Sequence, residues 1–311
     1  MKDRRILVIA GPTAVGKTEY AIAAAKAFNG EIVSCDSMQL YQYMDIGSAK
    51  PTEAEQQEAV HHLIDFLDPR EPFSVARYQE LARSAIDDIL ARGRLPIITG
   101  GTGLYLNSIL YDMDFAGAGE DSDLRDKLRN TADSEGPEAL HEQLRKLDPE
   151  AAERIHPNNV KKVIRAIERL KAGEGEVRPF DGGIRVNESY NPLLVCLTRD
   201  REELYERIKR RVDALIEAGL VDEVRSLMDM GLTADDISMK GIGYKEIIDY
   251  LNGETTLDDA VEIIKKNTRH YAKRQLTWFR RYDTIYMLNL SEYLCEEDAK
   301  RGLIDWLEKR L

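Results

Sequence analysis

Residues 9–21, IAGPTAVGKTEYA, have a spacing that can bind phosphate. Gly11 is followed after four residues by Gly16, Lys17 and Thr18, which matches the pattern G-x-x-x-x-G-K-[ST]. In such a loop the backbone N–H groups and the positive end of the next helix point at the anion. The lysine adds a charge, and the threonine hydroxyl can bind Mg²⁺. The expected phosphate-binding residues are Gly11, Pro12, Thr13, Ala14, Val15, Gly16, Lys17 and Thr18, with Thr18 as the Mg²⁺ ligand.

The segments around this loop follow the order that such a loop requires. An apolar run at residues 6–10 precedes it, and a helix-compatible segment at 17–28 follows. Further apolar runs, each expected to be or to contain a strand, lie at 31–36, 95–103, 193–198 and 284–289. Strands separated by helices predict a mostly parallel sheet, whose ligands bind beyond the strand carboxyl ends. The first three strands would therefore bring the loop, Asp36 and Thr102 to one edge.

The pattern changes between the third and fourth of the expected strands. Strand signals vanish there and charged helical segments replace them, so we expect a helical insertion domain at 116–190. The catalytic core would consist of 1–115 and 191–311. Asp200 and Glu203 resemble a capping box at the start of a helix. The predicted fold class is α/β, with a parallel sheet core like that of P-loop NTPases and an all-helical insertion domain.

Composition indicates an ordinary globular protein. Of 311 residues, 43% are hydrophobic and 32% are charged, and no run of 18 apolar residues occurs. The N-terminus leads directly into an expected strand, so we expect no signal peptide, no membrane span and a cytoplasmic location. Cys35, Cys196 and Cys295 are scattered, which argues against a zinc site or a disulfide framework. The lack of self-complementary heptads favours a monomer.

The net charge of −12 by itself argues against a nucleic-acid partner, but the basic residues are not evenly spread. Residues 265–282, KKNTRHYAKRQLTWFRRY, contain no acid, and positions 266, 269, 270, 273, 277 and 280 fall near one helical face. A second basic segment, HPNNVKKVIRAIERLKAG, lies at 156–173. Such cations can meet the phosphates of a nucleic acid.

The phosphate-binding loop alone does not identify a reaction. A nucleoside triphosphatase usually holds Mg²⁺ with an aspartate that ends an apolar strand, and Asp36 is the one candidate at this edge. A small-molecule kinase with Asp36 as the base is therefore an open alternative. A non-catalytic RNA-binding ATPase is another.

Six segments together carry a family resemblance. GPTAVGKT, SCDSMQLYQYMDIGSAKP, HHLIDFLDPREPFSVARY, TGGTGLYLNSIL, KGIGYKEI and YAKRQLTWFRR occur in this order. They resemble the successive signatures of the tRNA dimethylallyltransferases, from residue 11 to about 281. The resemblance implies transfer of a dimethylallyl group from dimethylallyl diphosphate to N6 of the adenosine 3′-adjacent to the anticodon, with Mg²⁺ as cofactor. Adenine-nucleotide isopentenyltransferases share the early motifs and remain an alternative.

The same resemblance implies roles for individual residues. Asp36 would be the catalytic base, and Thr102 would donate to the diphosphate. Arg207 and Arg211 lie four residues apart on one helical face, and one of them would contact the diphosphate. Which of the two does so stays open from the sequence.

The implied partner is the anticodon stem-loop of tRNA. The residues expected to contact it are Asp36, Ser37, Met38, Gln39, Thr102, Asn158, Asn159, Lys161, Lys162, Lys240, Gly243, Tyr244, Lys245, Lys273, Arg274, Gln275, Trp278 and Arg280.

Overall fold

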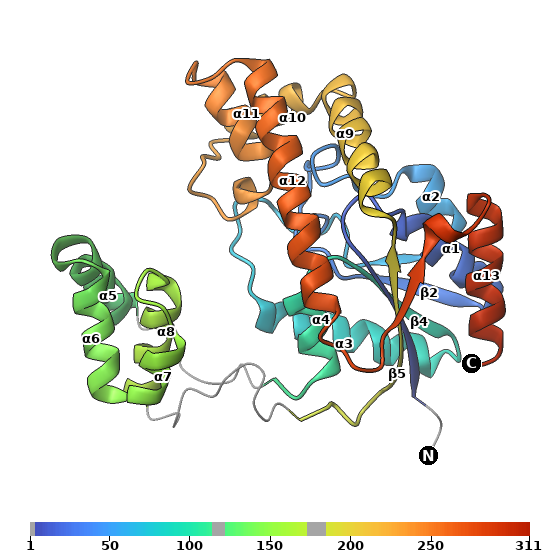
Figure 1. Ribbon diagram of the computed structural model, residues 1–311, viewed down its shortest axis with the longest axis horizontal. Coiled ribbons are helices and arrows are strands. Elements are labelled where there is room, and N and C mark those ends of the chain that lie inside the picture. Colours follow the sequence, from blue (N-terminus) through green and yellow to red (C-terminus); the bar gives the residue numbers. More distant parts are fainter. Residues whose placement is uncertain (1–3, 114–121, 173–184) are drawn as a thin grey trace. The chain divides into compact units, whose positions relative to one another are not determined.

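The computed structural model describes residues 4–113, 122–172 and 185–311 (Figure 1). The chain divides into two compact units. One consists of Met1–Leu110 and Asn187–Leu311, and the other is Tyr111–Val186. The sequence had placed the boundaries a few residues later, at 115/116 and 190/191.

A parallel sheet of six strands forms the centre of the first unit, in the order β3-β2-β4-β1-β5-β6. Its strands are β1 (Arg5–Ala10), β2 (Gly30–Ser34), β3 (His61–His62), β4 (Leu95–Gly100), β5 (Asn191–Thr198) and β6 (Tyr286–Asn289). Ala10 is in register with Gly100 on one side and with Cys196 on the other. The segments that leave β1 and β4 therefore start side by side at the carboxyl edge.

The central strands are buried on both faces. Leu7 and Ile9 belong to a core cluster that also contains residues of α1 (Lys17–Ala27) and α13 (Glu296–Glu308). Figure 1 shows these two helices on one side of the sheet, with α3 (Val75–Ala91) on the other. Continuous apolar strands of this kind are typical of parallel sheets covered by helices.

The other helices of this unit lie between or after the strands. They are α2 (Glu53–Glu58), α4 (Gly103–Leu110), α9 (Arg201–Glu217), α10 (Leu220–Asp229), α11 (Tyr244–Leu251) and α12 (Leu257–Phe279), with short 3₁₀ turns η1 (Ser238–Lys240) and η2 (Leu290–Glu292). The long helix α12 packs against α9, α11 and α4. Its central position brings the late part of the sequence next to the early loops.

The helices α3 and α9 begin with different caps. Ser74 caps α3 by accepting a hydrogen bond from the backbone N–H of Arg77, at 3.2 Å. The capping box at Asp200 is wrong, because its side chain makes no cap bond and instead accepts from Asn289 Nδ2 at 3.1 Å. The carboxylate of Glu203, the other expected member of the capping box, instead accepts a hydrogen bond from Arg199.

The amino end of β2 is fixed by a buried carboxylate. Glu31 is 1% exposed and accepts hydrogen bonds from Arg92 and Arg94, with His62 Nε2 at 2.7 Å. The bonds from Arg92, aided by His62, more than offset the cost of burial and lower the pKa of Glu31 to about 2. Because β2 leads to Asp36 at its other end, this cluster helps to anchor the strand that carries the candidate base.

The second unit has a helical core of its own. Its described helices are α5 (Ser122–Glu135), α6 (Pro137–Leu147), α7 (Pro149–Arg154) and α8 (Val160–Lys171). Leu140, Leu144, Val163 and Ile167 are fully buried in that core. The basic segment noted in the sequence forms α8, whose apolar side packs inward.

Cys35, Cys196 and Cys295 are free thiols. Across the described part of the chain, every helix is too short or too polar to span a lipid bilayer.

We predict that Ile167→Ala lowers the free energy of unfolding of the second unit by about 2–5 kcal/mol, because it leaves a cavity in a closed core. Ile167→Val should cost about 0.5–1.5 kcal/mol. Hydrogen exchange over 122–172 measures the effect, with exposed Glu153→Ala as the control. If Ile167→Ala accelerated hydrogen exchange in α1 as much as in 122–172, the prediction that the second unit packs independently would be wrong.

Candidate active site

The two glycines of the loop between β1 and α1 stand where other residues would be strained or would clash. Gly16 has φ +110° at the start of α1, and a Cβ on Gly11 would lie 2.7 Å from the carbonyl oxygen of Leu197. Lys17 Nζ donates to the carbonyl oxygen of Pro12 at 2.9 Å. The lysine is thus folded back over the loop that precedes it.

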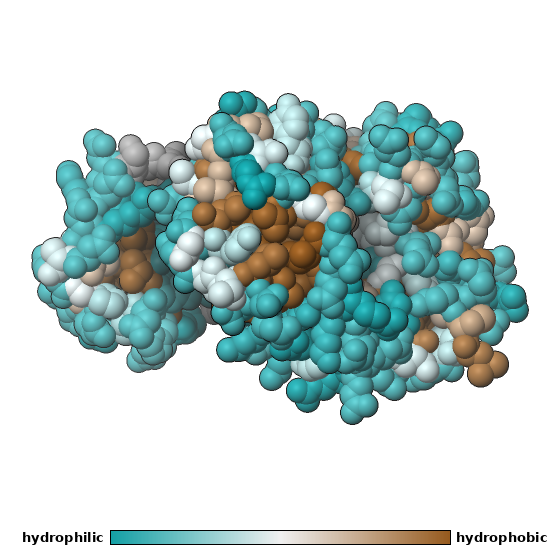
Figure 2. Space-filling view, turned by 90° about the horizontal axis from the view of Figure 1, so that it is seen from above, coloured by the Kyte–Doolittle hydropathy of each residue, from teal (hydrophilic) through white to brown (hydrophobic). Residues whose placement is uncertain are grey.

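A cavity of about 700 Å³ opens above this loop, beyond the carboxyl ends of the strands. Its walls include Thr13, Ala14, Gly16, Lys17 and Thr18 of the loop, Asp36, Ser37, Met38 and Gln39 after β2, Arg211 on α9, and Ile264, Thr268, Tyr271, Arg274 and Gln275 on α12. Ile237, at its rim, is 54% exposed. Figure 2, which looks down on the molecule as it stands in Figure 1, shows a mostly hydrophilic surface with a hydrophobic area near the middle.

The cavity combines buried cations with one central carboxylate. Burial lowers the pKa of Lys17 to about 8; the charge of Asp36 opposes this shift and that of Arg211 adds to it. Burial also lowers the pKa of Arg211, again opposed by Asp36. Asp36 therefore acts electrostatically on both cations, while its Oδ1 accepts from the N–H of Met38 at 2.9 Å.

Arg207 and Arg211 make different contacts at the phosphate-binding loop, although both line a smaller cavity of about 290 Å³ together with Ala14 and Gly16. Arg211 also lines the larger cavity, whereas Arg207 does not. Arg207 Nε donates to the carbonyl oxygen of Ala14 at 2.9 Å, and its guanidinium pairs with Glu296. The geometry thus separates two arginines that the sequence left equivalent.

Thr102 joins the two segments that leave β2 and β4. Its hydroxyl oxygen accepts from the N–H of Ser37 at 3.1 Å and lies 3.3 Å from the Ser37 hydroxyl. Thr102 does not line the cavity, although Tyr271, which does, lies in hydrogen-bonding contact with it. In this arrangement Thr102 positions the segment that carries Asp36.

Gln275, expected to contact tRNA, is largely engaged in hydrogen bonds within the protein. It is 5% exposed, and its Oε1 accepts from the N–H of Thr13 at 2.8 Å. Its Nε2 donates to the carbonyl oxygen of Gly101 at 3.0 Å. A Cβ on Gly101 would lie 2.1 Å from that nitrogen, so only glycine leaves room for the amide. Gln275 therefore ties the phosphate-binding loop to the glycine-rich loop after β4.

Tyr244, also expected to contact tRNA, is buried and bonded within the protein. Its side chain is 1% exposed, and its hydroxyl donates to Glu223 at 2.8 Å. The same carboxylate accepts from the successive N–H groups of residues 45–47 at 2.7–2.9 Å. Tyr244 and Glu223 thus fix the loop at 45–47, which borders the cavity. Gly243 is buried as well, whereas Lys240 and Lys245 are exposed.

Gln39 and Trp278 are partly engaged with the protein. Gln39 Nε2 donates to the carbonyl oxygen of Ala49 at 3.1 Å, on the cavity wall. Trp278 is half-buried, and a Cβ on Gly103 would lie 2.3 Å from its Nε1. One side of the Trp278 indole therefore packs closely against α4.

The remaining residues that were expected to contact tRNA are basic or polar, and their side chains are exposed. On α12 these are Lys273, Arg274 and Arg280, and in the second unit they are Asn158, Asn159, Lys161 and Lys162. Asn159 occupies the N-cap position of α8 without a side-chain cap bond. Lys265 does not belong to the free basic face, because it pairs with Asp213 at 2.8 Å.

The sequence interpretation missed several residues of the α12 wall. Ile264, Thr268 and Tyr271 line the cavity together with Gln275. Their spacing of four, three and four residues is that of one helical face, and it runs between the cations that drew attention to this segment. Burial raises the pKa of Tyr271, and the charge of Asp36 adds to this, so its phenol stays protonated.

Comparison with protein families and curated proteins gives consistent matches. The model of the family described as IPP transferase matches residues 39–282, and that described as isopentenyl transferase matches 4–70. A tRNA dimethylallyltransferase of Alkaliphilus oremlandii is 51% identical over 304 residues, 97% of each chain. Another, of Clostridioides difficile, is 48% identical over 308 residues, 99% of each chain.

Solved structures agree with these matches. The full-length tRNA isopentenylpyrophosphate transferase of Bacillus halodurans superposes with a TM-score of 0.75 at 43% identity, covering 99% of this chain and 96% of that one. A eukaryotic dimethylallyltransferase acting on tRNA gives a TM-score of 0.80 at 27% identity, covering 99% and 80%.

The lowered pKa of Lys17 predicts a pH-dependent anion affinity. With a pKa of about 8, its protonated fraction falls from about nine tenths at pH 7 to about one tenth at pH 9. Affinity for inorganic diphosphate should therefore fall about tenfold over this range relative to Lys17→Arg, which keeps its charge. Calorimetric titration of both proteins measures the ratio. A ratio independent of pH would show that Lys17 does not hold the anion.

Proposed function

Because the chain belongs to the IPP transferase family, we propose that its cavity binds dimethylallyl diphosphate at the phosphate-binding loop and presents tRNA adenosine N6 to Asp36. The activity is transfer of a dimethylallyl group to tRNA. The observation that carries the assignment of the site is that Asp36 shares one cavity with Lys17 and Arg211. A carboxylate for the acceptor and cations for the leaving group thus lie within reach of one bound molecule.

The leaving group is the end of the substrate that the loop would hold. Diphosphate carries the charge that grows as the carbon–oxygen bond breaks, and fixed N–H donors and cations in a buried site stabilise that charge. Lys17 and the N–H groups of the loop supply the first set. Arg211 is the better candidate for the diphosphate arginine, because it shares the larger cavity with Lys17 and Asp36, whereas Arg207 is bound to Ala14 and Glu296 and does not line that cavity.

Magnesium fits the oxygen donors of this site. Mg²⁺ is typically held by one or two protein oxygens, with water and substrate phosphates completing its shell. The Thr18 hydroxyl lines the cavity beside the loop and would be the protein ligand. Bound there, Mg²⁺ would neutralise part of the diphosphate charge.

Transfer breaks the bond between the allylic carbon and the diphosphate oxygen, which keeps the electron pair. The N6 lone pair forms the new carbon–nitrogen bond, and the surplus proton passes from N6 to the Asp36 carboxylate. The exocyclic amine is a weak nucleophile, so a carboxylate that orients it and accepts its proton contributes typically about 10²–10⁴-fold. Ser37 and Thr102 hold the segment in which Asp36 stands.

The acceptor adenosine is stacked in the anticodon loop and must be extruded to reach Asp36. Met38 and Gln39 line the cavity beside Asp36 and are positioned to contact that base. Exposed cations on α12 and on α8 would bind the RNA backbone, each within its own unit. With tRNA as acceptor, we infer action in the cytoplasm, as a monomer.

Asp36→Asn should lower kcat by at least about 10²-fold, because the amide cannot take the N6 proton. Affinity for tRNA in filter binding should change less than about threefold, because a single neutral substitution removes no phosphate contact. Incorporation of labelled dimethylallyl into unmodified tRNA measures turnover. Unchanged turnover would rule out Asp36 as the base.

The same assay separates the alternative functions. AMP and ADP offered in parallel should remain unlabelled, whereas labelling of nucleotide alone would indicate a free-nucleotide prenyltransferase. Hydrolysis of ATP without any prenyl transfer would instead indicate an ATPase or kinase.

The basic face of α12 yields a second prediction. Lys273→Ala with Arg280→Ala should weaken tRNA binding and reduce the slope of log K against log salt by about 1.4–1.8, if each cation neutralises one phosphate. Lys26→Ala with Arg301→Ala removes the same charge from exposed positions on α1 and α13 and is the matched control. Equal slopes in the two double variants would exclude α12 from the interface.

A further inference from the structure

The phosphate-binding loop is held from outside the cavity by two arginines. Arg199, which follows β5, is 5% exposed in its side chain, and its Nε donates to the carbonyl oxygen of Val15 at 3.1 Å. Arg207 on α9 donates from Nε to the carbonyl oxygen of Ala14 at 2.9 Å. Ala14 has φ +65°, a left-handed conformation that costs energy for a residue with a side chain. Two successive carbonyl oxygens thus point away from the cavity and each has a guanidinium partner.

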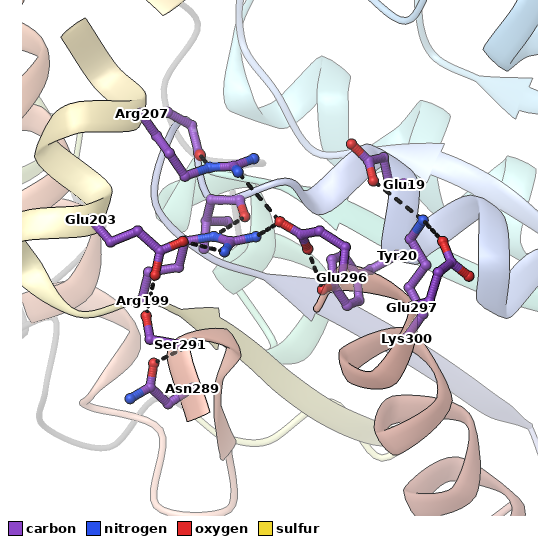
Figure 3. Close-up of polar contacts among 12 residues, drawn as sticks. Glu19, Tyr20, Arg199, Glu203, Arg207, Asn289, Ser291, Glu296, Glu297 and Lys300 are labelled. Atoms are coloured by element: carbon purple, nitrogen blue, oxygen red, sulfur yellow. Dashed lines mark hydrogen bonds and ion pairs between the residues drawn. The ribbon is translucent and has the colours of Figure 1, made fainter. Parts of the chain in front are cut away.

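Both guanidinium groups meet at one carboxylate oxygen. Glu296 Oε1 accepts from Arg199 and lies 3.3 Å from Arg207 NH1 (Figure 3). Its other oxygen, Oε2, accepts from the hydroxyl of Tyr20 at 2.7 Å. Tyr20 is fully buried on α1, the helix that begins at the loop. Glu296 therefore joins α13 to both sides of the loop.

A second carboxylate completes the pairing of Arg199. Glu203 on α9 accepts from Arg199 NH1 at 2.5 Å, and its other oxygen accepts from the Ser291 hydroxyl at 2.6 Å. Burial alone would raise the pKa of Glu296, but the hydrogen bonds from Tyr20 and Arg199 lower it. Two cations and two carboxylates thus balance in number behind the loop.

We propose that Glu296 is a positioning residue for diphosphate binding. It fixes Arg199 and Arg207 so that the carbonyl oxygens of Ala14 and Val15 stay turned outward. Each of these carbonyl groups shares a planar trans peptide with the N–H of the next residue, which therefore points the opposite way. The orientation of the carbonyl oxygens thus sets that of the loop N–H groups. The inference rests on the proposed function of the loop, and it reaches beyond the matched family regions, which end at residue 282.

A positioning role and a purely electrostatic role of Glu296 predict opposite changes in diphosphate affinity when the residue is removed. If Glu296 acted only as a negative charge near the loop, its removal would strengthen the binding of an anionic diphosphate. If it positions the arginines, its removal frees them from the carbonyl oxygens and weakens binding. The sign of the change in affinity therefore separates the two roles.

Glu296→Ala should weaken the binding of inorganic diphosphate in the presence of Mg²⁺ about tenfold, as expected for the loss of a charged hydrogen-bonding partner. KM for dimethylallyl diphosphate should rise by a similar factor, with KM for tRNA unchanged. Tyr20→Phe removes only one of the donors to Glu296 and should give a change of about twofold to threefold in the same direction. Calorimetry and steady-state kinetics provide these readings.

Glu297→Ala is the matched control, because Glu297 is the adjacent residue on α13 and pairs with Lys300 instead of with the arginines behind the loop. It should leave diphosphate affinity within about twofold. Glu296→Gln keeps the shape of the side chain and should fall between wild type and Glu296→Ala. It supplies the same test should the alanine variant fail to fold.

Lys17→Ala distinguishes failure of this inference from failure of the proposed function. Wild-type affinity retained in Lys17→Ala would mean that the loop does not hold the diphosphate. Loss in Lys17→Ala, together with unchanged or tighter binding in the folded Glu296 variants, would overturn the positioning role alone. Equal losses of diphosphate and tRNA affinity in the Glu296 variants would also overturn it, since they would indicate general destabilisation.

Discussion

The structure depends on one constraint: a loop that turns its N–H groups toward an anion must turn carbonyl oxygens away from it, and those oxygens need donors. The chain meets this need with side chains from distant segments rather than with a regular ladder. The contacts are Lys17 to Pro12, Arg207 to Ala14, Arg199 to Val15 and, on the acceptor side, Gln275 to Thr13. Because these donors and acceptors stand on α1, α9, α12 and the segment after β5, the loop can hold its shape only when the whole first unit is folded.

The same arrangement sets the electrostatics of the cavity. Lys17 and Arg211 are buried, so each carries a desolvation cost that favours an anionic ligand over water. Asp36 offsets part of that cost without making a direct hydrogen bond to either cation among the contacts of the described residues. Asp36, Lys17 and Arg211 therefore face one cavity together, where the proposed amine and phosphate oxygens would meet them. Arg207, by contrast, is paired with Glu296 behind the loop, and its charge supports the backbone instead of the ligand.

The sequence predicted the parts of this site that lie within a single segment. The phosphate-binding spacing, the strand before it and the position of Asp36 after β2 are local patterns, and the parallel sheet brings them together at one edge. The roles of Gln275 and Tyr244 depend on partners more than twenty residues away in each case, so no spacing in their own segment reveals that they are buried. The two-residue strand β3 was missed because it pairs only at the sheet edge. The capping box at Asp200 failed because Asn289, on a distant strand, competes for the same carboxylate.

The residues that line the rest of the cavity, more than the phosphate-binding loop itself, determine whether such a site favours hydrolysis or prenyl transfer. Water is the acceptor in a hydrolase, so its cavity must admit and orient water, whereas prenyl transfer requires that water be kept from an allylic carbon with cationic character. The lining of the cavity also includes Phe73, Tyr41 and Tyr105. Tyr105 stacks on Tyr78 with ring centroids 4.0 Å apart and meets Phe73 edge to face at 6.5 Å, so these rings are held in place. Aromatic faces exclude water and attract positive charge. A cavity that combines a phosphate-binding loop and cations with fixed aromatic rings is therefore suited to release a diphosphate and to protect the carbon that it leaves.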